Sequence, residues 1–91
     1  MEKWLAVIGL GYVGLPLALL AEKKGYKVLG IDIDKQKIQQ IKDKEPPFVD
    51  ELVDQWLPSS QMGVSTDFAR ISEVSTIAIC VPTPVLSLIH I

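Results

Sequence analysis

Cysteine and basic charge are both scarce in this sequence. Its 91 residues include a single cysteine, Cys80, which excludes an internal disulfide and suits a reducing compartment such as the cytoplasm. Lysine and arginine number 9 against 11 aspartates and glutamates, which gives a formal net charge of -2. A nucleic-acid-binding surface would show clustered lysine and arginine, so no nucleic-acid partner is expected. The sequence also lacks internal repeats and low-complexity linkers, and we assign no metal site to it.

Charge is absent altogether from one long stretch, residues 4–21, which contains only apolar residues and glycines. Such a run is long enough to span a bilayer as a helix, and the Met1-Glu2-Lys3 that precedes it is compatible with the start of a signal peptide. Three glycines and Pro16 would interrupt that helix, however, and the residues that follow complete a soluble strand-helix-strand pattern. We therefore interpret the run as a buried parallel strand joined to a buried helix face, and expect no membrane association.

Within this run, Gly9, Gly11 and Gly14 have the G-x-G-x-x-G spacing, directly after a short aliphatic segment and before a helical pattern. Asp32 ends a second apolar segment about 20 residues further on, where dinucleotide-binding folds place a ribose ligand. Gly9 allows a sharp turn out of the strand, Gly11 leaves room for a pyrophosphate, and Gly14 allows the helix to pack closely on the strand. The helix start directs N–H groups and a positive dipole end at the phosphates.

The remaining elements follow from periodicity and from helix start and stop signals. Gly25 should end the first helix, Asp34 should cap the second, and Thr66 or Asp67 should cap the last. The predicted strands cover 3–8, 27–31, 62–65 and 75–81, and the predicted helices cover 14–24, 35–44, 49–57 and 67–72.

This order predicts an α/β fold of the Rossmann type, a doubly wound parallel sheet with right-handed crossovers. The chain is too short for a complete dinucleotide-binding domain, so we expect the sheet to be incomplete at its carboxyl-terminal side. Three separate stretches, 9–14, Asp32 and 82–84, lie at the carboxyl ends of predicted strands. Ligands bind such sheets at that edge, so the three stretches predict one site.

The segments GLGYVGLPLA, GYKVLGIDID and VPTP together resemble the amino-terminal domain of nucleotide-sugar dehydrogenases, the UDP-glucose/GDP-mannose dehydrogenase group. The resemblance runs from about Trp4 to Pro84. It implies an enzyme that oxidises the C6 alcohol of a UDP-sugar to a carboxylate with two NAD+. Leu15-Pro16 and Pro82 look more like members that act on UDP-N-acetylhexosamines than like members that act on UDP-glucose.

The resemblance also implies roles for individual residues. The glycine-rich turn would wrap the pyrophosphate, Asp32 would hold the adenosine ribose, and Lys37 would lie near the adenosine end. The VPTP segment would contact the cofactor close to the reacting centre, where the Thr83 hydroxyl is a possible hydrogen-bonding group. The predicted NAD-binding residues are Gly9, Leu10, Gly11, Tyr12, Val13, Gly14, Asp32, Lys37, Pro82, Thr83 and Pro84.

No catalytic residue is assigned within this chain. The family's nucleophilic cysteine, its catalytic lysine and its substrate domain are expected beyond residue 91, and Cys80 lies inside a hydrophobic strand. We expect residues 1–84 to form part of the NAD-binding domain and residues 85–91 to be a tail that does not match the family. The full-length enzyme is expected to be a cytoplasmic homo-oligomer.

Several alternatives remain open at the level of sequence. Lys37 is either a cofactor contact or a solvated lysine, and Tyr12 either packs beside the cofactor or covers the sheet edge. Trp56 is interpreted as a core or partner-facing anchor rather than as a base-stacking platform. The competing function is an NAD-sensing regulatory module of the kind that gates potassium transport, but such a module has no need of a Pro-Thr-Pro segment.

Overall fold

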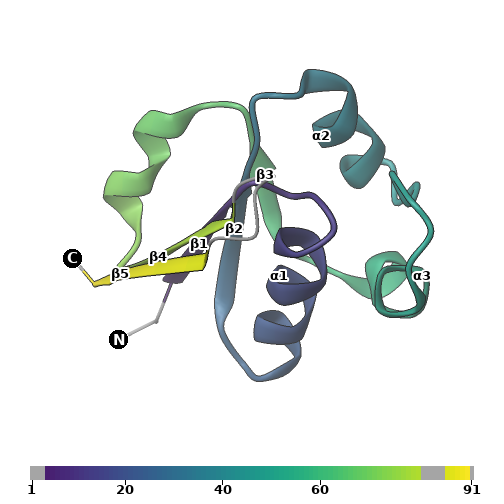
Figure 1. Cartoon of the computed structure of the whole chain (residues 1–91), viewed down its shortest axis with the longest axis horizontal. Helices are drawn as coiled ribbons and strands as arrows, with labels where there is room; N and C mark the ends of the chain where they lie inside the picture. Colours follow the sequence, from purple (N-terminus) through teal and green to yellow (C-terminus); the bar gives the residue numbers. More distant parts are fainter. Residues whose placement is uncertain (1–3, 81–85, 91) are drawn as a thin grey trace.

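The computed structural model describes residues 4–80 and 86–90, the latter as backbone only. A single sheet runs through the middle of the molecule, with α1, α2 and α3 on one side and the 3₁₀ segment η2 on the other (Figure 1). The helical elements are α1 (Gly14–Lys23), α2 (Lys35–Lys42), α3 (Glu51–Trp56), η1 (Leu57–Ser59) and η2 (Phe68–Glu73). The strands are β1 (Trp4–Ile8), β2 (Lys27–Ile31), β3 (Gly63–Ser65), β4 (Thr76–Cys80) and β5 (Leu86–His90).

The strands are ordered β3-β2-β1-β4-β5. The first four are parallel, with Ile8 opposite both Ile31 of β2 and Ile79 of β4. The order 3-2-1-4 is that of a Rossmann sheet, and it makes β1 the central strand whose carboxyl end lies between those of β2 and β4. The predicted Rossmann-type α/β fold is therefore confirmed. The run 4–21 is divided between β1 and α1, and no helix in the described part of the chain is long and apolar enough to cross a membrane.

Local signals account for the element boundaries. The Asp34 carboxylate accepts hydrogen bonds from the N–H groups of Gln36 and Lys37, which caps α2 as predicted. Gly25, with φ of 100°, ends α1, also as predicted. Of the two candidates for the last cap, Asp67 is the one used, since it accepts from the N–H of Ala69. The segment it caps is a 3₁₀ helix.

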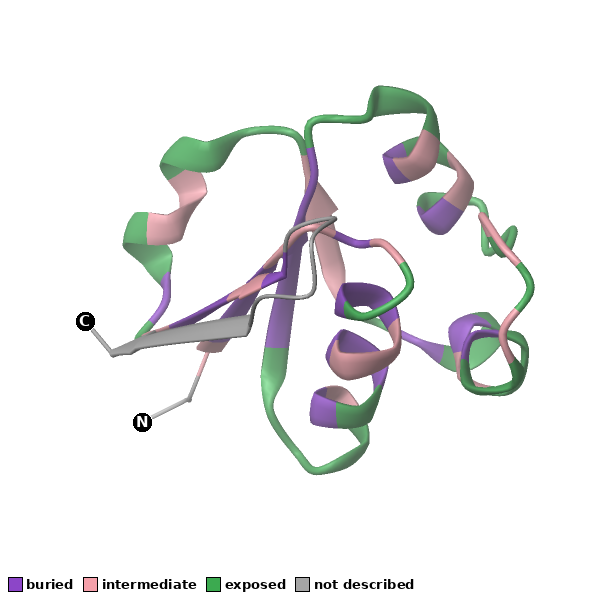
Figure 2. Cartoon of the chain, in the orientation of Figure 1, coloured by how far each residue is buried: buried purple, intermediate pink, exposed green. Residues whose placement is uncertain are grey.

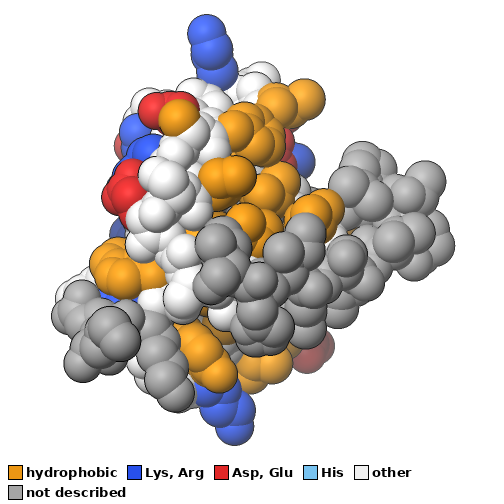
Figure 3. Space-filling model, turned by 90° about the vertical axis from the view of Figure 1, so that its left-hand side faces the viewer, with side chains coloured by type: hydrophobic (Ala, Val, Ile, Leu, Met, Phe, Trp, Pro, Cys, Tyr) orange, Lys and Arg blue, Asp and Glu red, His pale blue; other side chains and the backbone are white. Residues whose placement is uncertain are grey.

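Two hydrophobic cores hold the layers together. The larger one joins α1, α2 and α3 to the sheet, and its fully buried side chains include Leu15, Leu19 and Leu57. The smaller one, on the other face, contains Ala6, Leu29, Ile31, Val74 and Ile77. Helix surfaces turned toward the sheet are buried, and the opposite surfaces are exposed (Figure 2). On the η2 side, hydrophobic side chains gather on the molecular surface (Figure 3).

Residues 86–90 form regular structure that the sequence analysis did not predict. They make β5, which pairs antiparallel with β4 from Thr76↔His90 to Cys80↔Leu86. A run of apolar and β-prone residues beside an unpaired edge strand favours such pairing. The edge exists because the parallel sheet ends at β4.

Deletion of residues 85–91 is expected to leave the fold intact and to raise the soluble yield. The described buried side chains of both hydrophobic cores lie between Leu5 and Cys80, and the tail is a low-charge, β-prone segment of the kind that promotes association. Far-UV circular dichroism and thermal unfolding of the shortened and intact chains measure this. Loss of cooperative unfolding in the shortened chain would show that β5 is needed to cover the edge of β4.

Candidate functional site

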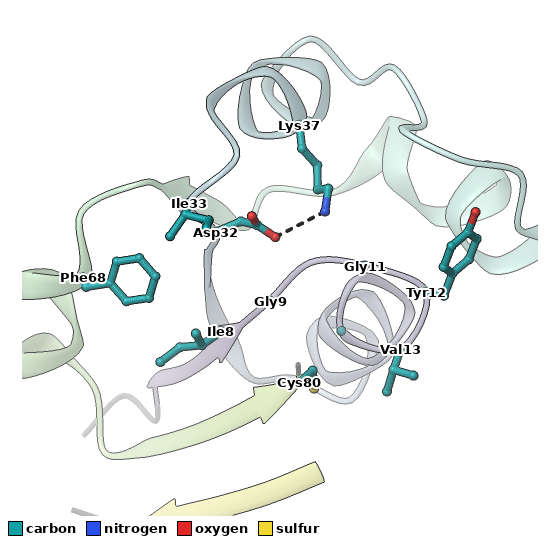
Figure 4. A pocket seen from close by; sticks show the side chains of 11 residues that line it. Ile8, Gly9, Gly11, Tyr12, Val13, Asp32, Ile33, Lys37, Phe68 and Cys80 are labelled. Atoms are coloured by element: carbon teal, nitrogen blue, oxygen red, sulfur yellow. Dashed lines mark hydrogen bonds and ion pairs between the residues drawn. The ribbon is translucent and has the colours of Figure 1, made fainter. Parts of the chain in front are cut away.

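A pocket of about 340 Å³ lies at the carboxyl ends of β1, β2 and β4 (Figure 4). Seven of the predicted site residues line it, together with four residues that the sequence analysis did not select. The predicted ones are Gly9, Gly11, Tyr12, Val13, Gly14, Asp32 and Lys37, and the others are Ile8, Ile33, Phe68 and Cys80. The turn after β1 and the end of β2 thus meet at one site, as the sequence analysis predicted.

The three glycines occupy three different environments. Gly9 has φ of 93°, and a Cβ there would lie 1.8 Å from the carbonyl oxygen of Cys80. A Cβ on Gly14 would lie 1.6 Å from the carbonyl oxygen of Gly9, so the start of α1 packs directly on the turn. A Cβ on Gly11 would meet nothing within 4 Å. The turn at Gly9 and the close packing at Gly14 are as predicted, and Gly11 faces open space on the pocket side of the turn.

The Asp32 carboxylate lies under this turn, and Asp32 is 8% exposed. Its Oδ2 accepts a hydrogen bond of 2.8 Å from the N–H of Leu10, and its Oδ1 accepts one of 2.9 Å from the N–H of Asp34. The ammonium group of Lys37 is 3.4 Å from Oδ2 (Figure 4). Burial raises the pKa of the Asp32 carboxyl, but the two N–H groups and the Lys37 charge together outweigh it, so this pKa lies below its ordinary value. The carboxylate is therefore ionised at neutral pH.

Lys37 is placed at the pocket by the capped first turn of α2. Its side chain is 26% exposed and reaches back from the helix to the carboxylate of Asp32. Lys37 is therefore not simply a solvated lysine, because its ammonium group is paired with the Asp32 carboxylate. Contact with a cofactor stays a prediction.

The amino end of α1 points at the pocket with no acidic residue in its first turn. The helix begins at Gly14. The N–H groups of Leu15 and Leu17 donate to the carbonyls of Gly11 and Val13, and Pro16 has no N–H. The positive end of the helix dipole is therefore free of any competing carboxylate from the helix itself. This end of the helix can bind an anionic group such as a phosphate.

Aromatic and aliphatic side chains form the rim of the pocket. Tyr12 is 76% exposed and its ring centroid lies 4.6 Å from that of Phe48, in the loop before α3. Packing of Tyr12 beside the cofactor stays a prediction. Ile33 and Phe68 lie on the other side of Asp32 (Figure 4). Both are exposed hydrophobic residues, and each follows a strand closely, which is the signal that would have selected them.

Leu10 differs from the rest of the predicted set because its side chain is fully buried in the core. Only its backbone can take part in the site. Cys80 is a buried free thiol in the same core, and burial raises its pKa, so it has the character of a small hydrophobe, in keeping with its place inside a hydrophobic strand. Trp56 packs on the larger core beneath Lys23, whose ammonium group is 5.7 Å from its ring centroid. Trp56 is partly buried against this core, in keeping with the first of its two predicted roles, a core or partner-facing anchor.

Pro82, Thr83 and Pro84 lie outside the described residues. Among residues 4–80, no group of three or more His, Cys, Asp or Glu side chains is arranged to hold a metal ion.

A glycine turn at the central strand, an open helix start and an ionised carboxylate at the end of the neighbouring strand define a dinucleotide-binding domain. Comparison with known proteins identifies the family. The model of the NAD-binding domain of the UDP-glucose/GDP-mannose dehydrogenase family matches residues 3–89. The chain belongs to this family, and its cofactor is NAD.

Individual relatives agree with this assignment. UDP-N-acetyl-D-mannosamine dehydrogenase of Methanococcus maripaludis is 38% identical over 89 residues, which cover 93% of this chain and 20% of the relative. The crystal structure of GDP-mannose dehydrogenase from Pseudomonas aeruginosa aligns with a TM-score of 0.73 at 27% identity, covering 91% of this chain and 21% of that one. The UDP-D-ManNAc dehydrogenase structure from Pyrococcus horikoshii aligns with a TM-score of 0.76 at 28% identity, covering 87% and 20%.

The chain therefore spans about a fifth of the length of the curated relatives it matches. These relatives are dehydrogenases of nucleotide sugars, and none of the comparisons given above favours the alternative of a potassium-transport regulatory module.

Proposed function

We propose that this chain is the NAD-binding part of an enzyme that oxidises the C6 alcohol of a UDP-sugar to a carboxylate with two NAD+. The observation that carries the proposal is the arrangement of Gly9, Gly11 and Gly14 beside the ionised Asp32. Gly9 and Gly14 make the turn compact, while Gly11 alone leaves open space toward the pocket. That open space is where the backbone can approach a pyrophosphate.

The residues present suit the two ends of the adenosine diphosphate part of NAD. The start of α1 offers the positive end of its dipole to the phosphates, with no acidic residue in its first turn. Asp32 is ionised and accepts hydrogen bonds, so it can hold ribose hydroxyls, and Lys37 lies beside it. NAD, when bound, supplies the acceptor for the hydride that leaves the sugar alcohol. The residues of this chain bind and orient that acceptor.

For the substrate we favour a UDP-N-acetylhexosamine over UDP-glucose. The relative with 38% identity is named UDP-N-acetyl-D-mannosamine dehydrogenase, and the Leu15-Pro16 that follows the third glycine agrees with that group. The full-length enzyme is proposed to be a homo-oligomer. We place it in the cytoplasm, where the free thiol of Cys80 would stay reduced.

Isothermal titration of the chain with NAD tests the proposal. Binding is expected with one NAD per chain, and Gly11→Ala is expected to weaken it because a Cβ would enter the space reserved for the pyrophosphate. ATP, which carries the same adenosine but a triphosphate, is the comparison ligand. A folded chain that binds neither NAD nor ATP would contradict the proposal.

The 91-residue chain alone is expected to show no dehydrogenase activity. Hydride transfer requires the sugar to be held against the nicotinamide, and the family resemblance implies a cysteine nucleophile that this chain lacks. Its single cysteine, Cys80, is buried with a raised pKa. NADH formation from UDP-N-acetylmannosamine and UDP-glucose, followed at 340 nm against a blank without protein, is the measurement. A rate above the blank would contradict this prediction.

A further inference from the structure

The Asp32 carboxylate joins two turns of the chain. One of its oxygens accepts from the N–H of Leu10 in the glycine turn, 22 residues earlier, and the other accepts from the N–H of Asp34 in the turn that leads into α2. The bond to Leu10 is buried. A charge-assisted hydrogen bond that is shielded from water is stronger than an exposed one, so this contact holds the glycine turn firmly.

The side chain of Leu10 is fixed as well. It is fully buried, and its Cδ1 and Cδ2 would lie 2.9 Å and 3.1 Å from a Cβ on Gly30, so it packs directly over the backbone of β2. The N–H of Gly9 donates to the carbonyl of Ile31 over 2.8 Å. Gly9 and Leu10 are thus held against β2 by the backbone N–H of Gly9, by the side chain of Leu10 and by the Asp32 carboxylate, which accepts from the N–H of Leu10. Gly11, which faces the pocket, follows immediately.

We propose that Asp32 is a positioning residue for the phosphate-binding turn, acting through the N–H of Leu10, in addition to being a ribose ligand. The inference rests on the proposed NAD-binding function of the site. An ionised carboxylate has about four lone-pair positions, so the two backbone N–H groups and the Lys37 ammonium leave capacity for a ribose hydroxyl. The two roles are compatible, and affinity for the phosphates should depend on Asp32 even when a ligand has no ribose hydroxyls.

The experiment uses 2′,3′-dideoxyadenosine diphosphate, which has the base and the pyrophosphate of the ligand but neither hydroxyl. Dissociation constants are measured by NMR titration of the wild type, Asp32→Asn and Asp32→Ala. Both variants remove the negative charge, but asparagine keeps one carbonyl oxygen that can accept from Leu10. We expect Asp32→Ala to bind this probe about tenfold more weakly than Asp32→Asn does. Equal affinity of the two folded variants would overturn the inference.

Amide hydrogen exchange gives a second readout. In the wild type the Leu10 amide is expected to be protected, and in Asp32→Ala it should exchange about tenfold faster or more. The Gly9 amide, bonded to the Ile31 carbonyl, serves as the internal control. Asp34→Asn is the matched control for loss of a nearby charge, since asparagine also caps helices and the N–H of residue 34 remains. Selective loss of protection at Leu10 would not follow from a general loss of stability.

The outcomes separate this inference from the proposed function. If the wild type binds neither NAD nor the dideoxy probe, the proposed function fails. If it binds both and the two Asp32 variants bind the probe equally, only the inference fails. If Asp32→Ala does not fold, hydrogen exchange of the wild type still tests the inference. A Leu10 amide that exchanges as fast in the folded wild type as in an unstructured peptide would overturn it.

Discussion

Replacing Asp32 by alanine is expected to weaken NAD binding by about ten- to over a hundredfold, because a hydrogen bond to a charged group contributes about 1.5–3 kcal/mol. The carboxylate is ionised and lies at the end of β2, where the adenosine ribose of a dinucleotide is held. Alanine removes the acceptor for the ribose hydroxyls and also the acceptor for the Leu10 N–H. Both losses act in the same direction on NAD.

The same substitution is expected to weaken NADP binding less, or to strengthen it. NADP carries a phosphate at the ribose 2′ position, which would meet the Asp32 carboxylate at contact distance. Lys37, 3.4 Å from that carboxylate, softens the repulsion, so the wild type should prefer NAD without excluding NADP. Calorimetric titration of wild type and Asp32→Ala with both cofactors measures the preference. Equal losses for NAD and NADP would mean that Asp32 acts only on the glycine turn.

Much of this site could be predicted from sequence because it depends on local constraints. The G-x-G-x-x-G spacing requires a turn with a positive φ at Gly9, and the apolar run before Asp32 places its carboxylate at the end of a parallel strand. Both follow from the chain near each residue. The cap at Asp34 is equally local, since its side chain accepts from the backbone N–H groups two and three residues further on.

Several contacts that sequence did not predict depend on how distant segments are placed. Phe68 follows β3 closely, but it reaches the pocket because β3 lies beside β2 and the following segment passes over the same edge. The bond from Leu10 to Asp32 spans 22 residues and depends on the exact register of β1 against β2. Likewise, β5 forms because β4 lies at the edge of the parallel sheet, a property of the whole sheet.

Alanine substitutions at Gly11 and Gly14 are expected to separate cofactor binding from folding. At Gly14 the added Cβ would lie 1.6 Å from the carbonyl oxygen of Gly9, which is backbone and cannot rotate away. Overpacking of this kind costs about 3 kcal/mol or more where backbone must move, so the melting temperature should fall by about 12 °C or more. At Gly11 the Cβ meets nothing within 4 Å, and the backbone φ is not positive. Stability should therefore change by less than about 1 kcal/mol.

Among folded molecules, Gly11→Ala should weaken NAD binding more than Gly14→Ala does, which is the reverse of the order of their effects on stability. Gly11→Ala fits the free protein but places a methyl group where the pyrophosphate must approach the backbone, so binding should weaken by about tenfold or more at nearly unchanged stability. Thermal unfolding by circular dichroism and NAD titration of the two variants and wild type measure the two effects. Gly25→Ala is the control for loss of a glycine outside the pocket, since a Cβ at Gly25 also meets nothing within 4 Å. Because φ at this position is 100°, the substitution should lower stability through backbone strain alone. The NAD affinity of the folded chain should be unchanged. If Gly11→Ala binds NAD as tightly as the wild type does, the pyrophosphate does not pass over this turn.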